Sequence, residues 1–231
     1  MVKKVLVVLT SASEMKNKNG DAKPTGWFLP EFAHPYDEFA KAGYELTVVS
    51  PKGGESKLDP ASIEMFKSDP SSTSFLNNQK DLWEKTKKLS DYVDKASEFD
   101  AVFYPGGHGP MLDLAVDAES QKLIANFFEA GKPVAAVCHA PIVLADVKLS
   151  TGEYLVKGKT VTGFTNKEEE IMQLVDYMPF LLEDKVKASG ASFVKADEPW
   201  GEKVVVDGKL ITGQNPASAK ALGEALVKVL G

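Results

Sequence analysis

The sequence predicts a single α/β domain, residues 1–231, with helices on both faces of a mainly parallel sheet. Four short runs of valine, leucine and other apolar residues recur along the chain, and their nearly continuous apolar character is typical of strands buried on both faces. These runs cover residues 2–9, 44–50, 100–105 and 132–138. An amphipathic helical pattern lies between the third and fourth runs. A strand, a helix and a strand in this order form the βαβ unit of parallel sheets, so the fold class follows.

The first helix is predicted within residues 26–43, where four aromatic residues are spaced along one apolar face. These residues are Phe28, Phe32, Tyr36 and Phe39. Glu31 falls beside this face, so periodicity alone makes it a solvated acid at the boundary. Pro35 cannot donate a hydrogen bond to the carbonyl of Glu31, which predicts a helix that is kinked there or becomes regular only from that point. His34 is expected to be an ordinary polar residue.

The segment 52–98 is too long for a plain connection between neighbouring strands, so it predicts an inserted cap. A charged helix is expected within this cap near residues 82–89. A further helix is predicted over residues 119–131, because its apolar residues share one helical face and Gly131 is placed to end it. The residues on that face are Leu123, Ile124, Phe127 and Phe128.

The C-terminal part is predicted to add a hairpin and a final helix. Asp207-Gly208 lies between two β-rich runs, which is a strong hairpin signal. The final helix is expected to have Asn215 as its N-cap and Pro216 at its first helical position. Its apolar face is formed by Leu222, Leu226 and Val229.

The composition is that of an ordinary globular chain, with 43% hydrophobic and 26% charged residues. The net charge is -6, and no cluster of lysines lies beside aromatic residues, so nucleic acid is not an expected partner. No apolar run approaches the length of a membrane span, and the short N-terminal run, closed by Thr10 and Ser11, predicts a strand and not a leader. One cysteine cannot form an internal disulfide, so a cytoplasmic, reducing location is expected.

That cysteine, Cys138, stands directly after the fourth strand run, in the stretch VAAVCHAP. If residues 139–146 open a helix, Cys138 occupies a tight strand-to-helix turn, the device that presents a nucleophile at the top of a sheet. The helix N-terminus would lower the pKa of the thiol and favour a thiolate. His139 offers a nearby base. These residues support equally well a buried, inert thiol at the end of a strand.

The stretch YPGGHG follows the third strand run and is expected at the same edge of the sheet. Gly106 and Gly107 permit the close backbone approach that an oxyanion hole requires, and His108 would lie near Cys138. An ordinary glycine turn is the alternative. The three histidines of the chain lack the close ligand spacing of a zinc site, so no metal is expected.

A run of acids in the stretch VTGFTNKEEE is explained by helix capping. Asn166 is the predicted N-cap, and Glu169 three positions later completes a capping box. Acids in a first helical turn also suit the helix dipole. One of them could instead orient His139, and the pattern does not choose which.

Together these stretches resemble the ThiJ/PfpI superfamily of glutamine-amidotransferase-like proteins, and within it the branch of glutathione-independent glyoxalases and heat-shock chaperones. The similar stretches are PEFAHPYDEF, YPGGHG, AAVCHAP, VTGFTNKEEE and TGQNPAS, within residues 2–229. The resemblance implies a flavodoxin-like three-layer sandwich. It also implies an enzyme that converts methylglyoxal and related α-oxoaldehydes to D-lactate-type hydroxy acids without glutathione, metal or another cofactor.

The resemblance also implies roles for the residues around the sulfur. Cys138 would add to the aldehyde as a thiolate, giving a hemithioacetal, and Glu31 would move a proton between the two carbons through an enediol. Backbone groups at Gly107 and His139 would bind the oxyanion. His108, in the same turn as Gly107, would belong to the substrate-binding part of the site.

His139 would act as a base that is held by an acid. The resemblance places that acid at Glu169, although Glu168 and Glu170 are close enough for a shift of one residue. Glutaminases of this superfamily use a histidine far downstream of the cysteine, and here none follows His139. Amidotransferase and conventional peptidase activity are therefore not expected.

Three other functions stay open at this point. They are a stress-related holdase chaperone that binds unfolded clients through segment 52–98, a protein deglycase, and a redox sensor based on oxidation of Cys138. Only the glyoxalase hypothesis accounts for both the acid and the histidine around the sulfur. A homodimer is compatible with the resemblance, and the three tryptophans are expected in such an interface or in the core. They are Trp27, Trp83 and Trp200.

Overall fold

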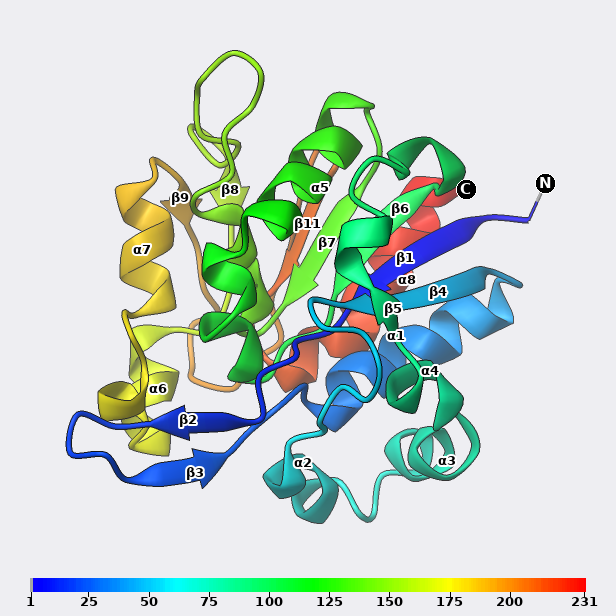
Figure 1. The fold of residues 1–231 in the computed structure, drawn as a ribbon. Helices are drawn as coiled ribbons and strands as arrows, with labels where there is room; N and C mark the ends of the chain where they lie inside the picture. The colour runs from blue at the N-terminus through cyan, green and yellow to red at the C-terminus, as the bar shows by residue number, and fades with distance from the viewer. Residues whose placement is uncertain (1) are drawn as a thin grey trace.

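A seven-stranded sheet runs through the computed structural model, which describes residues 2–231 (Figure 1). The strand order is β10-β11-β7-β6-β1-β4-β5, and neighbouring strands are parallel except for β10 and β11. The strands are β1 (Lys4–Val8), β2 (Glu14–Lys16), β3 (Ala22–Pro24), β4 (Glu45–Ser50), β5 (Lys87–Lys88), β6 (Ala101–Tyr104), β7 (Val134–Val137), β8 (Thr160–Val161), β9 (Ser192–Phe193), β10 (Val204–Asp207) and β11 (Leu210–Gly213). The α-helices are α1 (Leu29–Lys41), α2 (Pro60–Met65), α3 (Pro70–Asn78), α4 (Asp81–Glu84), α5 (Ala118–Glu129), α6 (Asn166–Met172), α7 (Leu182–Ala188) and α8 (Ala219–Leu230). Short 3₁₀ helices cover Leu89–Asp91, Ala96–Glu98, Gly109–Met111, Leu114–Val116, Ala140–Leu144, Val175–Tyr177 and Pro216–Ser218.

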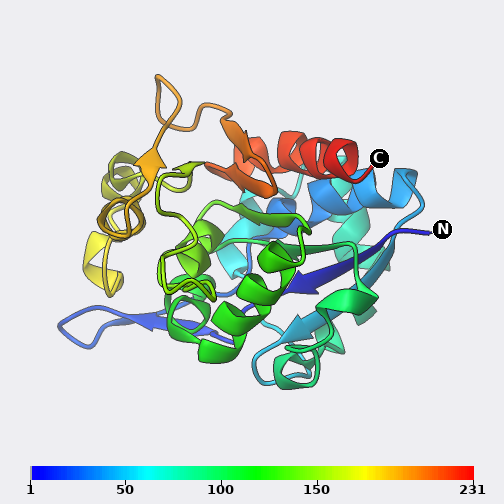
Figure 2. The ribbon, with the colours of Figure 1, turned by 90° about the horizontal axis from the view of Figure 1, so that it is seen from above.

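Helices cover both faces of the sheet. Helices α1 and α8 lie together on one face and α5 lies on the other, as the two views show (Figures 1 and 2). Phe32 and Leu222 belong to the core on the first face, whereas Leu123 and Phe127 belong to the core on the second. This three-layer arrangement confirms the predicted fold class. In the described part of the chain, no helix has the length and apolar character needed to cross a bilayer.

The four apolar runs form β1, β4, β6 and β7, as predicted. In β1, Val5 pairs with Leu46 of β4 on one side and with Ala101 of β6 on the other. Strand β6 pairs in turn with β7. Because parallel strands end at the same edge, the residues that follow β6 and β7 meet there. Strands β10 and β11 form the predicted hairpin, in which Gly208 has the positive φ of 63° that the turn requires.

Segment 52–98 forms three short α-helices, two 3₁₀ helices and the edge strand β5. The helix predicted over residues 82–89 is largely wrong, because α4 ends at Glu84. Thr86 contacts the sheet instead: its hydroxyl lies 2.7 Å from the hydroxyl of Ser50 at the end of β4. The following residues then pair with β4 as β5. Pairing with the sheet edge therefore overrides the local helical preference of this stretch.

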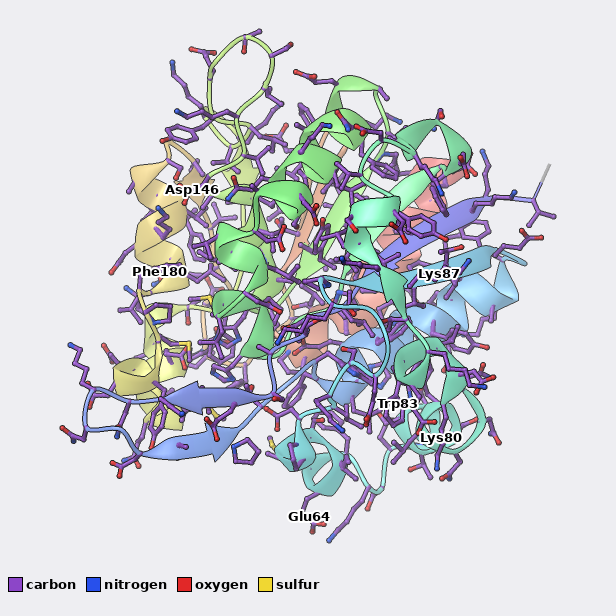
Figure 3. The ribbon with its side chains drawn as sticks, in the orientation of Figure 1. Glu64, Lys80, Trp83, Lys87, Asp146 and Phe180 are labelled. Carbon is purple, nitrogen blue, oxygen red and sulfur yellow. The ribbon has the colours of Figure 1, made fainter. Side chains whose placement is uncertain are left out.

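Phe75 and Trp83 of this segment join the core that packs against α1. The ring of Trp27 lies 6.1 Å from that of Phe75 in α3 and 5.8 Å from that of Trp83 in α4, measured between centroids. Trp27 and Trp83 are both buried, so these two tryptophans serve the core. The course of the segment can be followed in Figure 3 by the labelled residues Glu64, Lys80, Trp83 and Lys87.

Helix α1 is continuous from Leu29, so the late start that was one of the two alternatives at Pro35 is wrong, while the kink stays a prediction. Pro35 lies inside the helix and removes one hydrogen bond from its first turns. Helix α8 packs closely on this point, because Gly223 has no side chain: a Cβ there would lie 2.8 Å from the Cα of Pro35. Tertiary packing by α8 therefore supports the helix where its own hydrogen bonding is incomplete.

Helix α8 begins at Ala219, later than the predicted N-cap at Asn215. A 3₁₀ turn, Pro216–Ser218, lies between them. The side-chain amide of Asn215 donates instead to Glu168 Oε1 and to the carbonyl of Gly201, each at 2.8 Å. Asn215 and Pro216 thus begin the 3₁₀ turn and not α8, and Asn215 Oδ1 accepts from Ser218 Oγ at 3.1 Å instead of capping a backbone N–H.

Candidate active site

Three segments meet at the carboxyl edge of the sheet and form the candidate site. The turn after β6 supplies Gly106, the turn after β7 supplies Cys138, and the first turn of α1 supplies Glu31. A Cβ on Gly106 would lie 2.4 Å from Glu31 Oε2 and 2.9 Å from Cys138 Cβ. At Gly107, φ is +93° and a Cβ would lie 2.4 Å from the carbonyl oxygen of Gly26. The glycine pair is therefore required by the close approach of these segments.

Cys138 occupies the tight turn that the sequence predicts. Its φ is 62°, in the left-handed region that residues with a side chain rarely adopt. The turn is held from both sides, because its N–H donates to the carbonyl of Gly213 at 2.9 Å and its carbonyl accepts from the N–H of Phe164 at 2.8 Å. A strained backbone that is fixed in this way is characteristic of functional positions.

Glu31 is fully buried, although its place beside the apolar face of α1 suggested a solvated acid. Within residues 2–231, no group donates a hydrogen bond of ordinary geometry to either carboxyl oxygen. Burial raises the pKa of Glu31 to about 8, and the neighbouring Cys138 thiol and the N–H groups of Gly106 and Gly107 offset this only in part. A buried acid without a structural partner, directed at a cysteine, is better explained by chemistry than by folding.

Burial and the neighbouring Glu31 raise the pKa of the Cys138 thiol well above its ordinary value, and the N–H of Gly107 offsets them in part. The expected lowering of this pKa is therefore wrong. The helix that follows Cys138 is a 3₁₀ helix, Ala140–Leu144, which is too short to supply much dipole. The thiol and the carboxyl form a coupled pair that retains its protons at neutral pH.

His139 lies between the sulfur and a carboxylate. Its Nδ1 lies 3.3 Å from Cys138 Sγ, and its Nε2 lies 2.6 Å from Glu169 Oε2. The other oxygen of Glu169, Oε1, lies 2.9 Å from Nε2 of His108. One buried carboxylate thus joins both histidines. The side chain of His108 contacts Glu169 here, while its backbone remains part of the turn after β6.

The hydrogen bonds fix the protonation of these groups. An ionised carboxylate can only accept, so both histidines carry their proton on Nε2, and Nδ1 of His139 is free to accept the S–H proton of Cys138. Burial and the nearby His108 lower the pKa of His139 to about 4. Although burial acts to raise it, the pKa of Glu169 is held below its ordinary value by His139 and His108. His139 is therefore a neutral base at physiological pH.

The capping box of α6 differs by one residue from the prediction. Thr165, not Asn166, is the N-cap, and Glu168 completes the box. The second oxygen of Glu168, Oε1, accepts hydrogen bonds from the N–H of Trp200 at 3.0 Å and from the side chains of Gln214 and Asn215. Capping and loop anchoring therefore occupy Glu168, which leaves Glu169 to contact the histidines. Glu170 points outward and pairs with Lys167.

Substitutions of Glu168 and Glu169 test whether the first has a structural role and the second a catalytic one. Glu169→Gln replaces the acceptor for both histidines, so we expect kcat/KM to fall at least about 100-fold, since the wrong histidine tautomer in a comparable triad lowers kcat by about 10⁴. The midpoint of thermal unfolding should fall as well, because glutamine has one acceptor oxygen for two buried Nε2–H donors, and a buried donor without a partner costs about 1–3 kcal/mol. Glu168→Gln should lower that midpoint for the same reason but leave kcat/KM within a few-fold of wild type, because Glu168 accepts no hydrogen bond from either histidine. Steady-state kinetics and calorimetry on both variants distinguish the roles; equal effects on both measurements would contradict the assignment.

The structure also brings together three groups that could hold a metal ion. The ligand atoms of His108, His139 and Glu169 all lie within 4.8 Å of one another. Sequence spacing gave no indication of this, because the residues come from three different segments. The expectation of a metal-free site therefore stays a prediction. His34 lies apart from this group and pairs with Asp69 at 2.8 Å, so its Nε2 has a structural partner.

A pocket of about 520 Å³ opens onto Cys138, Glu31 and His139. Sequence reasoning missed two of its aromatic residues, Phe164 and Trp200, as parts of the site. The ring of Phe164 lies 4.2 Å from that of His139 and 5.6 Å from that of Trp200. The residue pattern gave no periodic signal for them, because both lie in irregular segments.

Comparisons with known proteins place the chain in a family. The model of the DJ-1/PfpI family matches residues 29–229. Glyoxalase 3 of Candida albicans is 32% identical over 230 residues, which cover 97% of each chain. The glutathione-independent glyoxalase HSP31 of Saccharomyces cerevisiae is 33% identical, over 94% of this chain and 93% of the relative. The crystal structure of glyoxalase III from Candida albicans superposes with a TM-score of 0.88 at 30% identity, covering 98% and 97% of the two chains.

These similarities extend over almost the whole chain and agree with the predicted superfamily. The strained cysteine turn after β7, the glycine turn after β6 and every strand of the seven-stranded sheet except β1 lie within residues 29–229. The chain therefore belongs to the DJ-1/PfpI family, in the branch whose relatives are named glutathione-independent glyoxalases.

Proposed function

We propose that this protein is an enzyme that converts methylglyoxal and related α-oxoaldehydes to D-lactate-type hydroxy acids, without glutathione or a metal. The observation that carries the proposal is the placement of the Cys138 sulfur between two groups of complementary chemistry. On one side lies neutral His139, at 3.3 Å, and on the other lies the buried, protonated Glu31. A nucleophile, a base and an acid are thus present in one pocket.

The reaction begins with addition of the sulfur to the aldehyde carbon. The S–H proton moves to Nδ1 of His139 as the carbon–sulfur bond forms. Glu31, which is protonated at neutral pH, donates its proton to the aldehyde oxygen. This step gives the hemithioacetal, an ionised Glu31 and a protonated His139. The backbone N–H groups of Gly107 and His139 stabilise the charge that develops on the oxygen.

The two carbons of the substrate then exchange a proton. Ionised Glu31 removes the C–H proton from the carbon bonded to sulfur, and His139 protonates the neighbouring carbonyl oxygen, which gives an enediol. Glu31 next delivers its proton to the second carbon. His139 takes the hydroxyl proton from the first carbon, so that a thioester of the 2-hydroxy acid forms on Cys138.

Hydrolysis of this thioester completes the cycle. Water attacks the thioester carbonyl and gives a proton to Glu31, while the departing sulfur takes a proton from His139. All three residues regain their starting protons. The aldehyde carbon has been oxidised and the ketone carbon reduced within one molecule, so the net change is the addition of water. The sequence of steps therefore needs no external oxidant, reductant or thiol.

Turnover without cofactors is the direct test. The purified protein, treated with EDTA and free of added thiol, should consume methylglyoxal and release D-lactate in equal amounts, with kcat in the usual range of about 1–10³ s⁻¹. Loss of the aldehyde can be followed by derivatisation, and D-lactate by a stereospecific dehydrogenase. Absence of turnover would refute the proposal. Activity that disappears with EDTA and returns with a divalent metal would instead assign the chemistry to the group of His108, His139 and Glu169.

The redox-sensor hypothesis receives less support from the geometry. Selective oxidation requires an accessible cysteine with a lowered pKa. Cys138 is 4% exposed and its pKa is raised. The base and the acid that flank the sulfur are explained by carbonyl chemistry, whereas oxidation of the sulfur would not need them.

A further inference from the structure

The pocket is much larger than the reaction of a three-carbon aldehyde requires. Its volume of about 520 Å³ lies within the range of about 300–1,000 Å³ that is typical of sites for drug-sized ligands. Cys138, Glu31 and His139 account for only part of its lining. The rest of the wall is mainly apolar and includes Phe28, Met65, Phe66, Phe164, Met172 and Trp200. We call these residues the apolar subsite.

The apolar subsite is continuous with the reacting groups. The ring of Phe164 lies 4.2 Å from His139 on one side and meets Trp200 edge to face, with 5.6 Å between centroids, on the other. Phe28 and Phe66 form a second edge-to-face pair, at 5.8 Å. A substituent on the carbonyl compound bound at Cys138 would therefore enter a pocket with aromatic walls, which favour apolar and planar groups.

Trp200 is held at this pocket against two unfavourable effects. Its φ of 66° is strained for a residue with a side chain, and 39% of the residue is exposed. The hydrogen bond from its N–H to the buried Glu168 maintains this conformation. Packing on Phe164 and this hydrogen bond therefore fix the indole as part of the pocket wall, although neither the strain nor the exposure favours folding.

Met65 provides a second, independent observation. It lies at the end of α2, is 61% exposed, and lines the same pocket as Trp200. Flexible methionine side chains suit surfaces that must fit ligands of different shape. The charged residues of the lining, among them Lys220 and Glu202, are of both signs, so the pocket offers no net attraction for a strongly anionic substituent.

We infer that the preferred substrates are α-oxoaldehydes whose ketone carbon carries a bulky apolar group, either a branched alkyl chain or an aryl ring, which the apolar subsite binds. The inference rests on the proposed function and names its substrate class. The reaction is unchanged: such an aldehyde takes up one water and leaves as the corresponding 2-hydroxy acid. Methylglyoxal is then the smallest member of the series and leaves most of the pocket unused.

The test compares substrates that differ in the size of this group. Isobutylglyoxal matches methylglyoxal in its alkyl electronics, and phenylglyoxal adds the aryl case. We expect kcat/KM of the wild type to be at least about tenfold higher for isobutylglyoxal than for methylglyoxal, since even one methylene group in an apolar pocket is worth about 10–200-fold. Phenylglyoxal is a usable probe because the chain contains no arginine, the residue that it modifies most readily.

Variants of the apolar subsite show whether the pocket causes this preference. Trp200→Ala and, independently, Met65→Ala should lower the ratio of the kcat/KM values for isobutylglyoxal and methylglyoxal several-fold, mainly through KM. Two matched exposed residues outside the pocket serve as controls: Tyr154→Ala, at 37% exposed, and Val116→Ala, at 66% exposed, should leave both values unchanged.

The outcomes separate this inference from the proposed function. Equal kcat/KM for the two alkyl aldehydes, or equal loss of both in the Trp200 and Met65 variants, would overturn the inference while leaving the glyoxalase function in place. No turnover of any of the three aldehydes would overturn both. Turnover of the bulky aldehydes with little of methylglyoxal would support the inference in its strongest form.

Discussion

Replacing Cys138 by serine should lower kcat/KM for methylglyoxal by at least about 10⁴-fold, as the loss of a covalent nucleophile does in other enzymes. A serine hydroxyl is a much weaker nucleophile than a thiol, and it gives up its proton to His139 far less readily than a thiol does. The fold should persist, because serine is slightly smaller than cysteine and can adopt the same strained backbone. Steady-state kinetics on Cys138→Ser and Cys138→Ala checks the loss of activity, and calorimetry on the same variants checks that the fold persists.

The intermediate offers an independent check on the same residue. Cys138 is the only cysteine of the chain, so any thiol adduct formed with the aldehyde must lie on it. Rapid acid quenching followed by mass spectrometry should show a mass increase equal to one methylglyoxal on wild-type protein and none on Cys138→Ser. A Cys138→Ala variant that keeps more than a tenth of wild-type activity would refute covalent catalysis.

Replacing Glu31 by glutamine should lower kcat/KM by about 10²–10⁴-fold, the usual contribution of a positioned acid and base. Glutamine has nearly the same shape but cannot give or take the proton. In the wild type, kcat/KM should fall as the pH rises through about 8, because the acid form of Glu31 starts the reaction and its pKa is about 8. That decrease should be absent from the residual activity of Glu31→Gln. Glu38→Gln, which changes an acid on the same helix outside the pocket, should behave as wild type.

The same substitution should change how stability depends on pH. The pKa of Glu31 is raised from 4.5 to about 8 in the folded protein, so its contribution to stability is complete below about pH 4.5 and is lost as the pH rises through 8. The loss at pH 8 is on the order of 4 kcal/mol, at about 1.4 kcal/mol for each unit of pKa shift. Calorimetry between about pH 5 and about pH 8.5 should therefore find Glu31→Gln increasingly more stable than wild type as the pH rises. If the free energies of unfolding of the two proteins differ by the same amount at every pH, Glu31 titrates normally.

The sheet and the position of the nucleophile could be predicted because their signals are local. Near-continuous apolar runs identify β1, β4, β6 and β7, and their shared direction brings Cys138 and Gly107 to one edge. The Asp207-Gly208 hairpin was equally clear. These features depend on residues that are close together in the sequence, where pattern and backbone preference act directly.

Helix boundaries were less predictable, because neighbouring residues can serve as the N-cap equally well. Thr165 and Asn166 are both good N-caps, and the choice between them depends on Glu168, which is fixed by donors from Trp200 and the segment after β11. The same one-residue shift decides which acid reaches His139. Likewise Asn215 precedes a 3₁₀ turn and not α8 itself; its Oδ1 accepts from Ser218 Oγ, and its NH2 group donates to Glu168 and to the carbonyl of Gly201.

The sequence by itself indicated the fold class and the tight turn at Cys138, and the resemblance indicated which residues lie around it. Only the tertiary structure decided that Glu31 is buried, that one carboxylate joins His108 and His139, and that the pKa of Cys138 is raised and not lowered. The reason is physical, because the charge state of a group depends on the solvent and the charges around it. At this site α1, the turn after β6 and α6 supply those surroundings. These segments are distant in the sequence and meet only in the folded chain.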